Sequence, residues 1–212
     1  MAKRKPSGAV IKRMPRYYRL LNMMNEKGIE SVSSSTLGDR LGLTASQVRQ
    51  DFNCFGGYGQ QGYGYNVKKL LAELRNILAI DREHTAIIVG AGNIGKAITR
   101  FEGLAKENIK ILALFDVNQE VIGKTIADRP IYDVSELATY IKEHNVDIGI
   151  IAARKSVAQE LADTMAEAGI RGIWNFAPLE ISSDVPVENV HFVDSLITLT
   201  YKMETEDDND ED

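Results

Sequence analysis

The strongest constraint on the fold is a Gly-x-Gly-x-x-Gly turn that follows a short β-branched run at residues 87–89 and precedes a helical pattern. Gly90 allows a tight strand-to-helix turn, Gly92 lets the backbone approach a pyrophosphate, and Gly95 lets the new helix press against the sheet. The pyrophosphate would lie at the positive end of that helix. The turn therefore predicts a dinucleotide site, with an ordinary glycine-rich turn as the alternative.

An acidic residue at the end of the next strand distinguishes between the two predicted classes of dinucleotide, NAD and NADP. Residues 109–115 form an apolar strand, and Asp116 follows it at the fingerprint's spacing of about twenty residues from the last glycine. A carboxylate there can hold both ribose hydroxyls and repels a 2′-phosphate, and no nearby arginine would receive one. The sequence predicts NAD rather than NADP, with a solvated aspartate as the alternative.

The remainder of this part alternates strands with helices. Apolar runs at residues 147–153 and 172–176 follow helical patterns, and this alternation predicts a doubly wound parallel sheet of the α/β class. Ligands of such sheets lie beyond the carboxyl ends of the strands. The other expected walls of the cofactor site are Ala153, Arg154, Phe176 and Pro178.

Charge is unevenly divided along the chain. Residues 1–80 carry 13 Lys and Arg against 5 Asp and Glu, whereas all 212 residues together have a net charge of −5. A basic first part joined to an acidic remainder indicates that the first part meets a polyanion.

Other features exclude several classes of protein. No apolar run approaches the ~20 residues that span a bilayer, and the basic start lacks the apolar core of a signal peptide. The single cysteine, Cys54, excludes an internal disulfide and fits a reducing cytoplasm. With three scattered histidines it offers no metal-ligand spacing.

The chain opens with a basic segment. Residues 1–14 have little apolar content, which predicts a flexible arm. Pro15 suits the first turn of a helix, whose apolar stripe begins at Tyr17. Arg13 and Arg16 lie off that stripe, so we expect both to be available for phosphates.

Two short helices joined by a glycine come next. Serines at residues 33–35 cap the first and Gly42 ends it, while Thr44 and Gln47 have capping-box spacing for the second. The pair is typical of a helix-turn-helix, in which arginine reads guanine and glutamine reads adenine. The alternative is a plain helical hairpin with a solvated polar face. The outward polar residues of the second helix include Ser46, Gln47, Arg49 and Gln50.

Glycine and tyrosine then alternate over residues 56–65, which predicts a twisted β-hairpin with Gln60 and Gln61 at its tip. A hairpin directly after a recognition helix is the wing of a winged-helix domain, and its tip can enter the minor groove. The alternative is a low-complexity loop. Cys54, between helix and wing, is expected to be a small buried hydrophobe.

The later helices have separate roles. Asn66 caps a leucine-rich helix that links the two parts of the chain. The last helix, residues 194–203, is apolar on several faces and must be buried on several faces. One nucleotide domain can cover only one face, so this helix is expected to insert into a partner subunit. The expected divisions are a basic arm (1–14), a DNA-binding domain (15–80), a nucleotide domain (81–190), a terminal helix (191–203) and a disordered acidic tail (204–212).

Several motifs in this order resemble the Rex family of bacterial redox-sensing transcriptional repressors. The resemblance runs from about Pro15 to Met203. It implies an N-terminal winged-helix domain, a Rossmann-type parallel sheet and a terminal helix exchanged between two subunits. It also implies NADH and NAD+ as cofactors and a homodimer that binds inverted-repeat operator DNA when NADH is scarce and releases it when NADH binds. The most specific motifs are residues 43–49, 55–56, 62–65, 90–95 and 175–178.

The resemblance also implies roles for individual residues. The cofactor would be held by Gly90, Ala91, Gly92, Asn93, Ile94, Gly95, Asp116 and Val117, with Ala153, Arg154, Phe176 and Pro178 as further walls. The DNA would be contacted by Ser46, Gln47, Arg49, Gln50, Gln60, Gln61 and Tyr63, besides Arg13 and Arg16.

This sequence departs from the family pattern at three places. Gln50, Gln60 and Gln61 stand where many relatives carry Lys or Arg, which predicts weaker phosphate binding and salt dependence. Arg154 and Lys155 stand where relatives usually have a small apolar residue and a proline, and the two alternatives are that these cations pair with the pyrophosphate or that they are solvated. Ser195 stands where relatives have a glutamate in the terminal helix, so the contacts between subunits are expected to differ.

The alternative function is a small NAD-dependent oxidoreductase. Such an enzyme needs an acid or base beside the nicotinamide and a place for its substrate. The chain beyond residue 80 provides about one nucleotide-binding domain and no substrate domain. Its last histidine, His191, is expected to be structural. A third alternative, RNA binding by the basic region, lacks exposed-aromatic motifs beyond the wing tyrosines.

Overall fold

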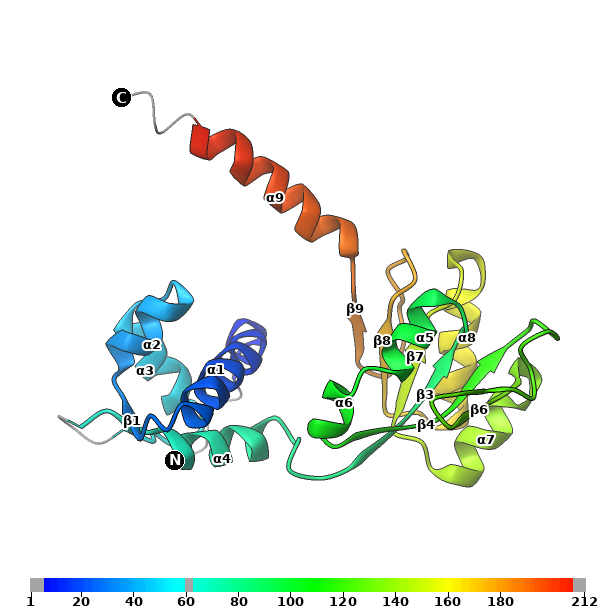
Figure 1. Ribbon diagram of the computed structural model, residues 1–212, viewed down its shortest axis with the longest axis horizontal. Coiled ribbons are helices and arrows are strands. Elements are labelled where there is room, and N and C mark those ends of the chain that lie inside the picture. Colours follow the sequence, from blue (N-terminus) through cyan, green and yellow to red (C-terminus); the bar gives the residue numbers. More distant parts are fainter. Residues whose placement is uncertain (1–5, 60–62, 208–212) are drawn as a thin grey trace. The chain divides into compact units, whose positions relative to one another are not determined.

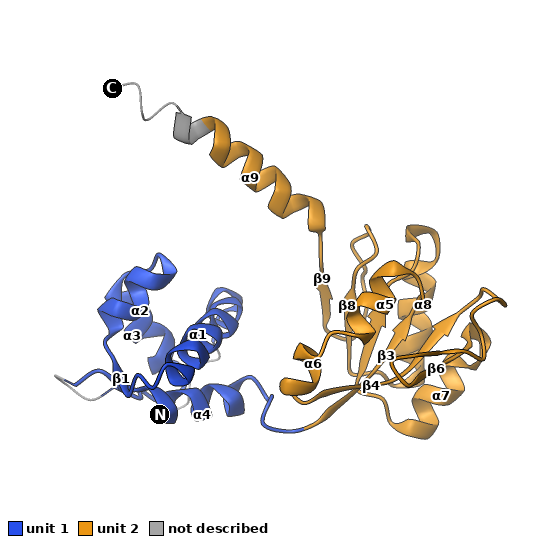
Figure 2. Cartoon of the chain, in the orientation of Figure 1, with its two compact units in different colours: residues 1–82 blue, residues 83–212 orange. Residues whose placement is uncertain are grey.

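A computed structural model describes residues 6–59 and 63–207 of the chain. Two compact units are present, and the boundary falls between Arg82 and Glu83 (Figure 2). The first unit is mainly helical and the second is built on a seven-stranded sheet (Figure 1). The first unit contains α1 (Gly8–Glu26), β1 (Ser31–Val32), α2 (Ser34–Leu41), α3 (Ala45–Asn53), β2 (Tyr65–Asn66) and α4 (Val67–Ile77).

Side-chain caps define where the helices of the first unit begin. The Ser33 hydroxyl accepts from the Thr36 amide at the start of α2, and Thr44 accepts from the Gln47 amide at the start of α3. Asn66 caps α4 in the same way through the Lys69 amide. These three caps confirm the helix starts expected from the sequence, because each satisfies an amide that has no partner within its helix.

Helix α1 corrects the expected arm and helix start. It begins at Gly8, capped by Ser7, and Pro15 lies inside it rather than in its first turn. Buried Val10 and Met14 continue the stripe of Tyr17 two turns toward the N-terminus. Because basic residues dominate this segment, the expectation overlooked its apolar stripe, which is the buried face of the helix.

The wing strand also differs from the expectation. Strand β2 pairs antiparallel with β1, with Val32 opposite Tyr65, rather than with residues 56–59. Those four residues form no strand in the part of the chain that the structure describes. Gln60 and Gln61 lie outside the described residues. The tyrosine–glycine alternation indicated a strand correctly but could not identify its partner.

Three aromatic rings stabilise the centre of the first unit. Phe52 of α3 packs against Tyr17 of α1 at 4.8 Å between ring centroids and against Tyr65 of β2 at 5.1 Å. All three rings are buried, together with leucines of α2 and α4. The core therefore joins α3 to both α1 and the strand pair.

The second unit confirms the predicted doubly wound parallel sheet. Its strand order is β5-β6-β4-β3-β7-β8-β9, and every pairing is parallel except that of β5 with β6. The sheet winds in opposite directions from β3, so its switch point lies between β3 and β7. The strands are β3 (His84–Val89), β4 (Ile109–Asp116), β5 (Thr125–Ile126), β6 (Arg129–Asp133), β7 (Ile148–Ile151), β8 (Gly172–Asn175) and β9 (Val187–Asn189).

Helices pack against both faces of this sheet, with a separate hydrophobic core on each face. Side chains alternate along β3, so Ile87 belongs to the core under α7 and α8 while Ile88 belongs to the core on the opposite face. Both residues are fully buried. The helices are α5 (Asn93–Thr99), α6 (Gly103–Lys106), α7 (Leu137–His144), α8 (Lys155–Ala168) and α9 (Phe192–Asp207).

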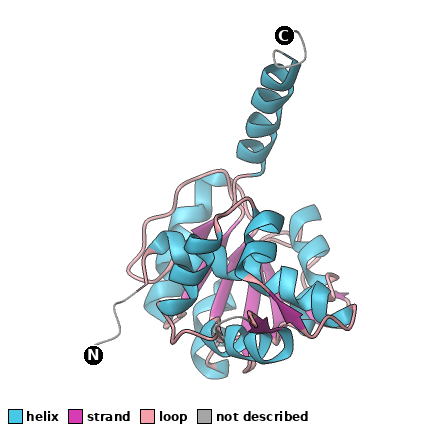
Figure 3. Ribbon diagram, turned by 90° about the vertical axis from the view of Figure 1, so that its left-hand side faces the viewer, coloured by secondary structure: helices cyan, strands magenta, loops and turns pink. Residues whose placement is uncertain are grey.

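Helix α9 is the exception to this packing. It follows β9 and extends away from the sheet (Figure 1 and Figure 3). The helix continues to Asp207, four residues beyond the expected end at Met203 and into the segment expected to be disordered. No helix among the described residues is long and apolar enough to cross a membrane.

An ion-paired carboxylate joins three strands at the amino end of the sheet. Asp147, directly before β7, accepts hydrogen bonds from the Thr85 amide at 3.1 Å and from Arg171 Nη1 at 2.7 Å. Burial raises the pKa of Asp147, but the bonds from Arg171 and Thr85 outweigh burial and hold the pKa below its ordinary value.

We expect Asp147→Asn to lower the free energy of unfolding of the second unit by about 1–2 kcal/mol near neutral pH. Because the folded pKa is depressed, the stabilisation is complete above the ordinary value of 3.8 and is lost as pH falls through the folded value. The difference from wild type should therefore shrink below about pH 4 in urea titrations. A difference that stays constant with pH would contradict this origin.

Candidate functional site

The glycine turn after β3 is shaped by close backbone contacts. Gly90 has a φ of +107°, and a Cβ on it would collide with the carbonyl of Ala152 at the end of β7. A Cβ on Gly95 would collide with the Gly90 carbonyl, so α5 approaches the turn more closely than alanine allows. Gly92 differs, because its Cβ position is open space. Gly90 and Gly95 are therefore required by the backbone packing, whereas Gly92 leaves open space beside the turn.

Asp116 lies directly against this turn. Its Oδ2 accepts a hydrogen bond from the Ala91 amide at 2.7 Å, and its Oδ1 accepts from the amides of Val117 and Asn118 at 2.8 and 2.9 Å. The side chain is half-buried, with backbone donors around both oxygens. The parallel pairing of β3 with β4 thus places the predicted carboxylate beside the predicted turn.

A cavity of about 750 Å³ opens at the carboxyl ends of β3, β4 and β7. Its size suits a ligand of cofactor class. Six of the expected cofactor residues line it, namely Gly90, Gly92, Asp116, Val117, Ala153 and Arg154.

The cavity also has walls that the sequence analysis missed. They come from the turn before α7, from the first residue of α7 and from one side of α8, in the two segments that follow β6 and β7. Their position after strand ends was the signal that could have found them. These residues are Val134, Leu137, Val157, Glu160, Leu161 and Thr164.

Other expected cofactor residues lie around the cavity rather than in its lining. Ala91 is buried and its amide donates to Asp116, while Gly95 is the buried residue of α5 that packs against the Gly90 carbonyl. Asn93 and Ile94 are exposed at the start of α5. Ala91 and Gly95 therefore shape the turn without lining the cavity, whereas Gly90 does both.

Phe176 and Pro178 belong to a loop after β8 that buried Asn175 fixes. The Asn175 side-chain amide donates to the carbonyls of Ala177 and Leu179, and its oxygen accepts from the Ala177 amide. The Phe176 ring packs against Trp174 at 4.5 Å and against Phe192 at 5.8 Å between centroids. Phe176 thus contacts the first residue of α9 instead of lining the cavity.

The expected DNA-facing residues of α3 are mostly accessible. Ser46, Arg49 and Gln50 are exposed and Gln47 is half-buried. Arg49 Nη1 donates to the Ser34 hydroxyl of α2 at 3.0 Å. In the wing region Tyr63 is 82% exposed. The polar face of α3 and the Tyr63 ring are thus both accessible to solvent.

The two arginines of α1 have different environments. Arg16 is exposed and donates to the Leu41 carbonyl at 2.7 Å. Arg13 was expected to be free for phosphates, but its guanidinium makes two 2.7 Å hydrogen bonds to the carboxylate of Asp51. Its side chain is only 19% exposed. The structure therefore corrects the expectation for Arg13, whose donors are turned inward.

Comparisons with known proteins agree with both units. Residues 6–53 match a family described as a putative DNA-binding protein N-terminus, and residues 81–179 match the CoA binding domain family. The redox-sensing transcriptional repressor Rex of Clostridium botulinum strain Alaska E43 is 49% identical over 93% of this chain and 95% of its own. Rex of Caldicellulosiruptor bescii is 47% identical over 95% and 94% of the two chains.

Solved structures give the same result. The crystal structure of RSP in complex with β-NAD+ and operator DNA has a TM-score of 0.90 and 42% identity, covering 97% of this chain and 95% of that one. RSP in complex with β-NADH also has a TM-score of 0.90, with 40% identity and 97% of each chain covered. These relatives are regulators, which sets aside the dehydrogenase alternative. The chain belongs to the Rex family of redox-sensing transcriptional repressors.

Proposed function

We propose that this chain senses the NADH/NAD+ ratio and binds operator DNA as a homodimer when NADH is scarce. The observation that carries the proposal is the position of Asp116, 2.7 Å from the Ala91 amide of the glycine turn and in the wall of the 750 Å³ cavity. A carboxylate at this position suits the ribose hydroxyls of NADH or NAD+. RSP, similar over nearly the full chain, has been solved with both dinucleotides.

The DNA is bound by the first unit in this proposal. Helix α3 enters the major groove, where Gln47 and Arg49 reach base edges, and Ser46 and Gln50 contact bases or phosphates. Arg16 contacts a phosphate, and Tyr63 contacts the DNA together with Gln60 and Gln61, which lie outside the described residues. Support comes from the exposure of α3 and of Tyr63.

The homodimer forms through α9. Along this helix the large apolar side chains are at least half exposed, which is unusual for a soluble chain. A second copy that covers several faces of α9 would bury them, and an exchange of the terminal helices does this. The exposed residues are Phe192, Val193, Leu196, Ile197, Leu199, Tyr201 and Met203.

Coupling between the two sites requires differential binding. NADH must bind the DNA-incompetent dimer more tightly than the competent one, and operator DNA must do the reverse. The Phe176–Phe192 contact joins the loop after β8 to the N-terminal end of α9. We therefore assign α9 as the element whose position both ligands bias.

The first test is fluorescence anisotropy of a labelled A/T-rich inverted-repeat duplex at fixed salt. We expect the protein to bind it and to release it as NADH is added at micromolar levels, while NAD+ has a much weaker effect. Binding that is indifferent to NADH would contradict the coupling. Absence of binding to several such duplexes would contradict the DNA-binding function.

Two glycine variants separate the cofactor site from the fold. Gly92→Ala adds a methyl group in open space, so we expect an unfolding temperature close to wild type but at least about tenfold weaker NADH binding, because the methyl group meets the pyrophosphate. Gly95→Ala collides with the Gly90 carbonyl and should lower the unfolding temperature by several degrees. Calorimetry gives the unfolding temperature of each variant, and NADH titration gives its affinity for NADH. Unchanged NADH binding by Gly92→Ala would contradict the proposed site.

The role of α9 is tested by Leu196→Lys, with Tyr63→Lys as the control at an exposed position of the first unit. A charge in the middle of an apolar interface should convert the dimer to a monomer at micromolar concentration, because the lysine would be buried without a partner. Light scattering after size exclusion gives the mass. A Leu196→Lys protein that remains dimeric would contradict the proposed interface.

A further inference from the structure

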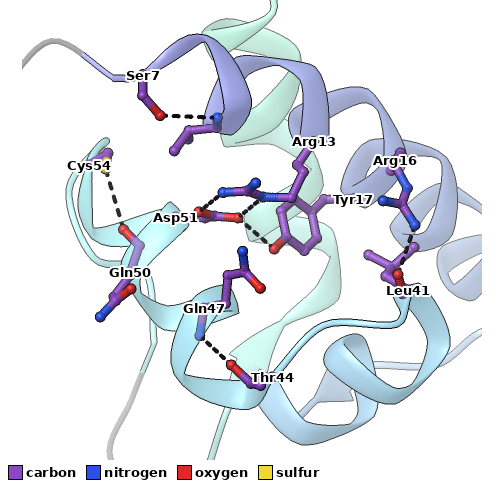
Figure 4. A network of polar contacts seen from close by, with 11 residues as sticks. Ser7, Arg13, Arg16, Tyr17, Leu41, Thr44, Gln47, Gln50, Asp51 and Cys54 are labelled. Carbon is purple, nitrogen blue, oxygen red and sulfur yellow. Dashed lines mark hydrogen bonds and ion pairs between the residues drawn. The ribbon is translucent and has the colours of Figure 1, made fainter.

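The recognition helix α3 carries an acidic residue on its inner face. Asp51 is 2% exposed and lies between α3 and α1. Its Oδ1 accepts from Arg13 Nη2, and its Oδ2 accepts from Arg13 Nε, both at 2.7 Å (Figure 4). The Tyr17 hydroxyl donates to Oδ2 at 2.8 Å. Both oxygens of Asp51 are therefore occupied by donors from α1.

This network differs in kind from the apolar contacts around it. Val48 and Phe52 are fully buried on the same side of α3, but apolar contacts are non-directional and tolerate small shifts. The planar guanidinium fork of Arg13 fixes distance and orientation at the same time. Burial and the bond to Asp51 raise the pKa of Tyr17, so its hydroxyl remains a donor.

Helix α1 also holds the other helix of the pair. Arg16, three residues after Arg13, donates to the Leu41 carbonyl at the end of α2. Two arginines of one helix therefore bind one partner in α2 and one in α3, on either side of the Gly42 turn. Helix α1 thus binds both helices of the helix-turn-helix through hydrogen bonds of its arginines.

We propose that Arg13, Asp51 and Tyr17 are positioning residues for DNA recognition, which orient α3 without touching DNA. The inference rests on the proposed DNA-binding function. Arg13 acts through Asp51 because its side chain is mostly buried and both its Nε and its Nη2 donate to the Asp51 carboxylate. A buried ion pair contributes little net stability, and its best-attested use is to specify one arrangement among several.

The positioning role and a simple charge effect predict opposite changes in operator affinity for Asp51→Asn. Asp51→Asn removes a negative charge from a DNA-binding unit, and electrostatics alone would tighten DNA binding. We expect operator binding to weaken by about tenfold instead, because the asparagine amide repels one arm of the Arg13 fork and α3 shifts. Anisotropy titrations at several salt concentrations give both the affinity and its salt dependence.

Arg13→Lys provides a second independent variant. A lysine would preserve a phosphate contact but cannot form the bidentate fork. We therefore expect a loss of operator affinity similar to that of Asp51→Asn, whereas an Arg13 that only contacted a phosphate would be replaced by lysine with little change in affinity or salt slope. Arg19→Lys is the matched control, because Arg19 is an exposed arginine of the same helix. It should bind as wild type does.

A merely structural role is distinguished by the double variant Arg13→Met/Asp51→Leu. Replacement of a buried ion pair by apolar residues is often neutral for stability, and this variant also leaves the buried Tyr17 hydroxyl without its acceptor. Its unfolding temperature should therefore fall by only a few degrees, while operator affinity remains about tenfold lower. Wild-type affinity in this variant would overturn the proposal. If the double variant does not fold, Tyr17→Phe decides, because it keeps the ring against Phe52 and removes one bond to Asp51.

NADH binding reports separately on the second unit. It should stay within about twofold of wild type in every variant, since none of the changes lies in that unit. A wild-type chain that binds no operator would count against the proposed function. A wild-type chain that binds operator and releases it with NADH, together with Asp51→Asn, Arg13→Lys and Tyr17→Phe variants that bind equally well, would overturn the positioning role alone.

Discussion

The second unit depends on one close backbone contact, that of α5 with the glycine turn. Gly95 lies so near the Gly90 carbonyl that any side chain would separate helix from turn, and Gly90 meets the end of β7 in the same way. This packing brings the Ala91 amide to the Asp116 carboxylate across the β3–β4 pair. The cavity at the switch point of the sheet follows from these contacts, because its walls are the ends of the same strands.

Much of this arrangement could be predicted from the sequence because the signals were local. The glycine spacing, the acidic strand end and the alternation of strands with helices each depend on a few neighbouring residues, and all three agree with the structure. Contacts between distant residues were harder to predict. Arg13 was expected to face DNA because nothing in the sequence pairs it with Asp51, 38 positions away. The strand pairing of Val32 with Tyr65 was missed for the same reason.

The two units combine opposite electrostatic requirements in one chain. The first unit needs a basic exterior for DNA. In our proposal its recognition helix is nevertheless oriented by the buried carboxylate of Asp51, whose charge is neutralised by Arg13. The second unit needs a carboxylate at its ligand site and surrounds Asp116 with backbone donors rather than cations. Communication between the units is therefore not expected through direct charge contacts. We expect the apolar helix α9, whose first residue Phe192 packs against Phe176, to carry it instead.

The central claim is that cofactor and operator bind to opposing states of one dimer, and linkage makes this claim testable from the cofactor side. The affinity for NADH should be measured by fluorescence titration with and without saturating operator duplex at the same salt. The account predicts that operator weakens NADH binding by the same factor by which NADH weakens operator binding. Equal NADH affinity with and without operator would contradict it, however tightly each ligand binds alone.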